Sequence, residues 1–147
     1  YVQADLVDDN YLLLQKIAFL GHEVTYHYDV LDANSGSFIK SIDEFKSNLE
    51  KFKKYGFSVK TVCPHGNPVI IRDGWNSNKD FFRDAKVVQL FPNILDIVVL
   101  LPHKLDYNYK YISDAGYGFK EIVNIKDNDL KNNGDKNIDN YKELLKI

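Results

Sequence analysis

Strand-like and helix-like segments alternate through the first half of this chain. Three short segments rich in β-branched and aromatic residues predict strands, and two longer segments with apolar residues at helical spacing lie between them. We expect strands at Tyr1–Leu6, His22–Asp29 and Ser58–Cys63, and helices at Asp9–Leu20 and Ser37–Tyr55. This order is typical of parallel strands joined by right-handed helical crossovers, so it predicts an α/β sheet that is mostly parallel.

The second of these helices has the clearest pattern. Its apolar residues step by four, three, four and three positions, which places them in one stripe. They are Phe38, Ile42, Phe45, Leu49 and Phe52. Lysines gather near its end and Gly56 follows, as expected for a helix C-terminus. Ser41 and Glu44 have the spacing of a capping box, which leaves Ser41 as a second possible start.

The first helix is expected to begin with Asp9 as its N-cap. Leu13, Ile17 and Leu20 then lie at helical spacing and predict its buried face, and Gly21 predicts its end. The four residues after the next strand, 33–36, have the composition of a loop.

The second half gives weaker signals. Ser77 can cap a short helix that contains Phe81 and Phe82, and residues 126–137 have the composition of a loop. The further strand candidates are Ile94–Leu101, Tyr109–Ser113 and Phe119–Ile125, and a last helix is expected from Ile138 through Leu145. We expect residues 1–147 to form a single domain, because a chain of this length suits one core.

Composition excludes several classes of protein. The net charge of −2 predicts no nucleic-acid partner, and no apolar run reaches the roughly 20 residues that span a bilayer. The single cysteine, Cys63, excludes an internal disulfide. The chain contains no methionine, so we expect that Tyr1 is not the natural N-terminus. The sequence indicates neither a targeting segment nor an oligomeric state.

Polar side chains gather on one face of the second predicted strand. Glu23, Thr25, His27 and Asp29 share a face, because side chains alternate along a strand. Carboxylate and imidazole groups are ligands for divalent metals and partners in acid–base chemistry, and they are poor material for an ordinary core.

Functional sites in parallel α/β folds gather at the carboxyl ends of the strands. His27 and Asp29 are expected there, and Cys63 and His65 end the neighbouring strand. Each residue also has a plainer interpretation. His27 can be a hydrogen-bonded structural residue, His65 a turn residue between Pro64 and Gly66, Cys63 a small buried side chain, and Asp5 a helix cap.

The segment Leu20–Asp29 resembles the second motif of NodB-type polysaccharide deacetylases, carbohydrate esterase family 4. That motif begins Gly-His-Glu and leads into a metal-binding histidine, and His27 lies at that position. The segments Lys60–Pro68 and Tyr111–Gly116 resemble parts of a divergent branch of the same family. The resemblance covers most of the chain and implies an incomplete or deformed (β/α) barrel.

The chain also departs from the family pattern. The second metal histidine would lie at position 31, which is Leu31. The paired aspartates of the family belong to a strand before Tyr1, and its Leu-x-His motif would follow Ile147. We therefore expect the central portion of a barrel that lacks its first and last strands. A Pro-His-Gly-Asn-Pro segment replaces the Arg-containing motif, and Arg72 follows closely.

The resemblance implies metal-dependent removal of acetyl groups from N-acetylated sugars or polysaccharides. The expected metal is zinc, held by His27, Asp29 and His65. His65 and Asp29 are also the candidates for proton transfer, and the expected substrate contacts are Tyr28, Arg72 and Trp75. Without the paired aspartates, we expect the isolated chain to be weak or inactive. The alternative is a glycan-binding or structural relative that has lost its metal site, which Leu31 favours.

Overall fold

The computed structural model describes residues 1–67, 69–100, 111–113, 119–122 and 136–138. The chain divides into two compact units, Tyr1–Leu101 and Pro102–Ile147. Whether both belong to one domain, as the length of the chain predicts, stays a prediction.

The first unit contains a small parallel sheet. Its strands β1 (Tyr26–Tyr28), β2 (Thr61–Pro64) and β3 (Leu95–Asp96) lie in that order, and both pairings are parallel. Val2 adds a single parallel bridge beside Tyr26. The expected strand-crossover-strand order is therefore confirmed, although the strands are shorter than predicted. The architecture shown is mixed α/β with an open sheet of three strands.

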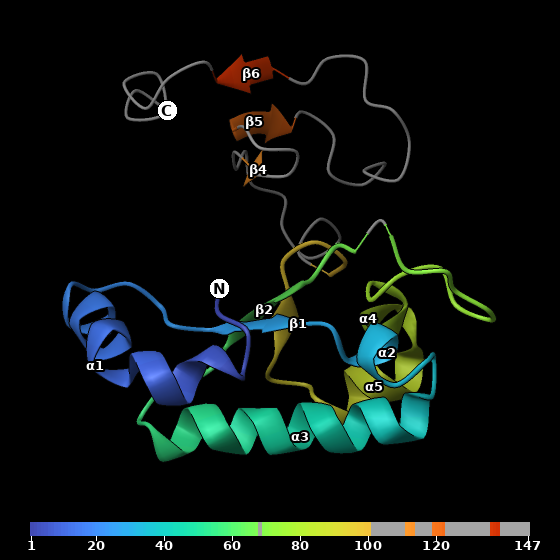
Figure 1. Cartoon of the computed structure of the whole chain (residues 1–147), viewed down its shortest axis with the longest axis horizontal. Helices are drawn as coiled ribbons and strands as arrows, with labels where there is room; N and C mark the ends of the chain where they lie inside the picture. The colour runs from blue at the N-terminus through green and yellow to red at the C-terminus, as the bar shows by residue number, and fades with distance from the viewer. Residues whose placement is uncertain (68, 101–110, 114–118, 123–135, 139–147) are drawn as a thin grey trace. The chain divides into compact units, whose positions relative to one another are not determined.

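Helices pack along and beside this sheet (Figure 1). The long helix α3 (Phe38–Lys54) runs along one side, and α1 (Leu6–Phe19) lies toward one end of it. At the other end are three short helices: α2 (Val30–Ala33), α4 (Asp80–Arg83) and α5 (Ala85–Leu90). Within the described residues, no helix has the length and apolar character needed to cross a membrane.

Aromatic rings form the centre of the core. The ring of Phe45 on α3 has its centroid 5.4 Å from Tyr26, 5.1 Å from Phe81 and 4.9 Å from Phe91. Tyr28 packs against the same group. Alternate residues of β1 therefore point toward α3, because side chains alternate along a strand. His27, between the two tyrosines, points to the opposite face.

The structure confirms the apolar stripe that was predicted for helix α3. Phe45 and Phe52 are fully buried, and the other stripe residues pack against the core. Ser37 is the N-cap, so the capping-box start at Ser41 was wrong; the Ser41 hydroxyl donates instead to the carbonyl of Val30.

Helix α1 differs from its prediction. It begins at Leu6, three residues before Asp9, and its buried residues are Val7 and Leu14. Leu13 and Leu20, which were expected on the buried face, are exposed. The helix has leucines on several sides, so its apolar pattern does not identify the side that packs.

Some details differ from the predictions. Residues 34–36 form turns as expected of the predicted loop, but residue 33 ends the short helix α2, and neither α2 nor α5 was foreseen. The predicted strand Ile94–Leu101 is reduced to Leu95–Asp96. In the second unit β4 (Tyr111–Ser113), β5 (Phe119–Ile122) and β6 (Lys136–Ile138) form an antiparallel sheet, so not all the strands are parallel. The expected final helix lies outside the described residues, apart from Ile138 in β6.

Candidate functional site

Two histidine side chains meet at the carboxyl edge of the parallel sheet. The Nε2 atom of His27 lies 3.0 Å from the Nδ1 atom of His65. The rings are nearly perpendicular, at 89°, and their centroids are 5.0 Å apart. His27 thus has a nitrogen atom from the neighbouring strand end within reach, and its role as a metal ligand stays a prediction.

The register of β1 and β2 explains this meeting. His27 pairs with Cys63, and His65 follows two residues later, so all three side chains share one face of the sheet. The backbone N–H of His65 donates to the carbonyl oxygen of Tyr28 at 2.6 Å, which extends the pairing just beyond β2. Two segments 38 residues apart are thereby fixed side by side.

The two ring nitrogens share a hydrogen bond in which the tautomers decide the donor, and their separation is also near that of two imidazole ligands of one metal ion. Zinc binds imidazole nitrogen at about 2.0–2.1 Å in tetrahedral sites, which places two such nitrogens about 3.3 Å apart. The observed 3.0 Å is close to that value. Among the described residues, however, no group of three or more histidine, cysteine, aspartate or glutamate side chains could hold a metal ion. The pair therefore fits as two ligands of a site that needs others.

Asp29, the third expected ligand, lies at the start of α2. It lines a small polar hollow together with Asp5, Glu44 and Asn48. Burial raises the pKa of the Asp29 carboxyl, and the negative charge of Glu44 raises it further, whereas His65 lowers it. The pKa of Asp29 is thus influenced by the charge of His65, while its side chain lines the hollow beside α3.

Glu23, at the other end of the polar face, holds the start of β2. Its carboxylate accepts hydrogen bonds from the backbone N–H groups of Lys60 and Thr61, both at 2.9 Å, and from the Thr61 hydroxyl at 2.8 Å. The Thr25 hydroxyl donates to the Thr61 carbonyl. These two residues therefore secure the strand pair from which the histidines extend.

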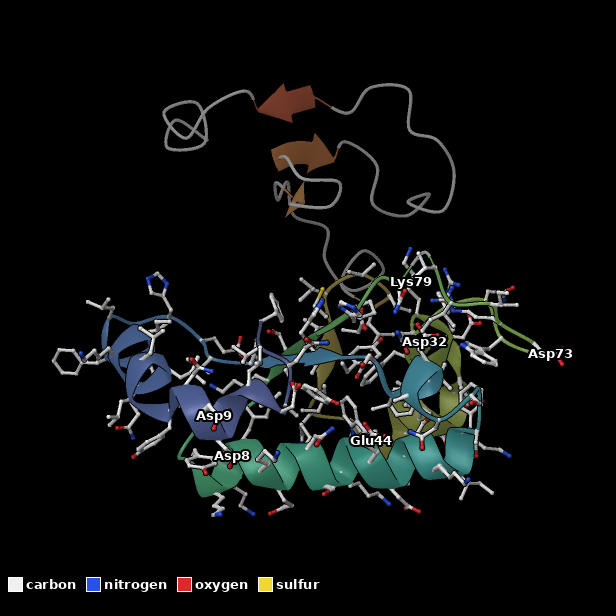
Figure 2. All side chains as sticks on the ribbon, viewed as in Figure 1. Asp8, Asp9, Asp32, Glu44, Asp73 and Lys79 are labelled. Atoms are coloured by element: carbon white, nitrogen blue, oxygen red, sulfur yellow. The ribbon has the colours of Figure 1, made fainter. Side chains whose placement is uncertain are left out.

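Arg72 and Trp75, expected to contact substrate, both donate to Asp32. Asp32 belongs to α2 and is labelled in Figure 2. The guanidinium of Arg72 reaches both carboxylate oxygens at 2.7 Å, and the indole N–H of Trp75 donates at 2.8 Å. Burial alone would raise the pKa of the Asp32 carboxyl, but these hydrogen bonds outweigh it and the net pKa is lowered. The carboxylate is therefore ionised at neutral pH. A substrate contact by Arg72 or Trp75 stays a prediction.

Asn78 joins this group to His65. Its side chain is fully buried, and its Oδ1 atom accepts hydrogen bonds from the backbone N–H groups of Leu31 and Asp32. Its Nδ2 atom donates to Asp32 and to the carbonyl oxygen of His65, both at 2.9 Å. One side chain thus connects α2 with the turn after β2.

Tyr28, the remaining expected substrate contact, belongs to the core. It is fully buried, and its hydroxyl donates to Asp96 at 2.6 Å. Asp96 is buried at the end of β3, where its other oxygen accepts the backbone N–H groups of Val98 and Val99. Leu31, where the family resemblance places a second metal histidine, is also fully buried and offers no donor.

Sequence reasoning missed Asp32, Asn78 and Asp96. None of them lies in a periodic pattern, and each acquires its role from a partner 40 to 68 residues away. One signal pointed to Asp32. It is an acidic residue four positions after Tyr28, and it lies next to the loop predicted at residues 33–36. No protein-family model, curated protein or solved structure matches this chain.

Proposed function

We propose that this chain is the central part of a deformed (β/α) barrel of the polysaccharide-deacetylase type, in which His27 and His65 hold a divalent metal ion. The observation that supports the proposal is the 3.0 Å separation of their ring nitrogens at the carboxyl edge of a parallel sheet. That edge is where α/β enzymes place their catalytic residues. The proposed metal is zinc, which accepts imidazole ligands.

The proposed reaction is hydrolysis of the acetamide group of an N-acetylated sugar. A zinc ion bound there would lower the pKa of a water molecule to about 7 and polarise the amide carbonyl. His27 and His65 must both be in the neutral form to bind a metal. Asp29 is the proposed proton-transfer group, because its raised pKa is closer to neutral pH than that of an ordinary carboxyl.

Zinc titration of the purified chain tests this proposal. We expect one zinc ion per chain to bind at micromolar concentration, measured by calorimetry and by metal analysis after dialysis. The His27→Ala variant should lose this ion. The His22→Ala variant is the matched control, because His22 is exposed and lies five residues away in the same segment. Failure of the unaltered chain to bind zinc would exclude the metal site.

Acetate release from an N-acetylglucosamine oligomer tests the reaction. We expect weak zinc-dependent release at most, since the family resemblance places the paired aspartates on a strand before Tyr1. A measurable rate of acetate release that is the same with and without zinc would contradict the proposed reaction.

A second candidate function is glycan binding by a relative that has lost its metal. The buried Leu31 favours it, as does the lack of a third donor among the described residues. Oligosaccharide binding by a chain that takes up no zinc would support this alternative.

A further inference from the structure

The turn that bears His65 is tied to α2 through one buried carboxylate. The Asp32 side chain is 3% exposed and accepts four hydrogen bonds, two from Arg72 and one each from Trp75 and Asn78. The bidentate arginine fixes the plane of the carboxylate, because its two parallel N–H groups match the two oxygens. Asp32 is therefore held in one orientation.

Asn78 transmits that orientation to His65. Its amide oxygen accepts two backbone N–H groups of α2, so the amide cannot turn over without losing both bonds. Its amide nitrogen then donates to the Asp32 carboxylate and the His65 carbonyl. The main chain of His65 is held on both sides, since its N–H donates to Tyr28.

Stability alone does not explain this arrangement. A buried ion pair contributes little net stability, because removing both charges from water offsets their attraction. One of the contacts, the hydrogen bond from Asn78, reaches the backbone carbonyl of His65, the residue whose ring meets His27. Groups that orient metal-binding histidines have a measurable effect on metal affinity.

We propose that Asp32 and Asn78 are positioning residues that hold His65 at coordination distance from His27. The proposal depends on the proposed metal site for its functional meaning, but the positioning itself can be measured without metal. Arg72 keeps Asp32 ionised and oriented, so in this proposal it acts on the site through Asp32.

The test compares Asp32→Asn with Asp80→Asn. The first variant keeps the side-chain size but replaces one carboxylate oxygen by an NH2 group, which cannot accept. Two hydrogen bonds must then break, either those from Arg72 and Trp75 or those from Arg72 and Asn78. The second is the matched control. Asp80 lies in the same part of the chain and accepts hydrogen bonds from Asn76 and Arg83, but these contacts do not involve His65.

Two measurements are needed for each variant. In the metal-free chain at pH 8, NMR of the histidine rings reports their tautomers, and we expect Asp32→Asn to change the His65 signals while Asp80→Asn leaves them unchanged. In the zinc titration we expect Asp32→Asn to weaken binding by about 10–100-fold. If Asp32→Asn does not fold, Arg72→Lys takes its place, because lysine keeps the charge but loses the bidentate geometry.

The outcomes separate the two proposals. Unchanged His65 signals and unchanged zinc affinity in a folded Asp32→Asn or Arg72→Lys variant would overturn the positioning role and leave the metal site intact. An equal loss of affinity in Asp80→Asn would also overturn it, since general destabilisation would then explain the effect. If the unaltered chain binds no zinc, the metal site fails, and the NMR comparison still decides the positioning role.

Discussion

At the scale of single residues, the buried contact between Tyr28 and Asp96 has a pH dependence that the structure defines. Burial raises the pKa of the Asp96 carboxyl, and the hydrogen bond from Tyr28 lowers it again in part. The net pKa is raised above the unfolded value. Asp96 therefore favours folding most at low pH, and its contribution is lost as the pH rises through the folded pKa.

We predict that Tyr28→Phe destabilises the chain more at pH 7 than at pH 4. The variant removes the bond that partly compensates the buried charge, so it raises the pKa of Asp96 further and leaves the ionised form with one partner fewer. Loss of a hydrogen bond to a buried charged group costs about 1–3 kcal/mol. Urea unfolding at the two pH values measures the difference.

Tyr26→Phe is the control for this experiment. Tyr26 is on the same strand and equally buried, and its hydroxyl accepts a hydrogen bond from the neutral amide of Asn48. Loss of this hydrogen bond should lower the free energy of unfolding by the same amount at both pH values. Equal pH dependence in the two variants would contradict the role assigned to Asp96.

The residues of the candidate site could be predicted only in part. His27 and His65 could be found because strand alternation and strand order are local signals, and these place both residues at one edge of the sheet. The partners of Arg72 and Trp75 could not, because their hydrogen bonds to Asp32 span 40 and 43 residues. No local pattern encodes which carboxylate a distant arginine meets.

At the scale of elements, the same contrast holds between two helices. The stripe on α3 predicted its bounds to within a residue or two, because its other faces are charged and only one side can be buried. Helix α1 has Leu12, Leu13 and Leu14 in succession, and only Leu14 is buried. In such a helix tertiary packing selects which side is buried, so sequence periodicity could not predict the buried side.

The connection between α2 and α3 gives a prediction at this scale. Gly36 has φ of +77° and lies directly against the ring of Trp75, whereas Gly56, after α3, has φ of +83° and open space around its α-carbon. Alanine is strained at both positions by roughly 1–2 kcal/mol. At Gly36 it also overlaps the indole, which adds a packing cost of about 1–3 kcal/mol.

We therefore expect Gly36→Ala to lose clearly more stability than Gly56→Ala in urea unfolding. Trp75 is the only tryptophan in the chain, so its fluorescence should shift in Gly36→Ala and stay unchanged in Gly56→Ala. Equal losses in the two variants would show that Trp75 does not pack on Gly36 as described.

At the scale of the whole molecule, the division into two units places the candidate site within the first. The unit Tyr1–Leu101 contains His27, His65, and Asp32 with the residues that donate to it. It also contains every core residue that the structure describes. A compact unit of a chain that contains its own hydrophobic core can fold alone. The stability of the first unit should then depend little on residues after 101.

We predict that a chain shortened to residues 1–101 unfolds cooperatively, with a urea midpoint close to that of the full chain. Trp75 fluorescence reports on both, because the residue contacts Asp32 inside the first unit. If the proposed metal site is correct, the shortened chain should also bind zinc with similar affinity, since it retains His27 and His65. A shortened chain with the fluorescence of an unfolded protein would show that residues 102–147 complete the core. A folded chain that has lost the zinc binding of the full chain would show instead that these residues contribute ligands.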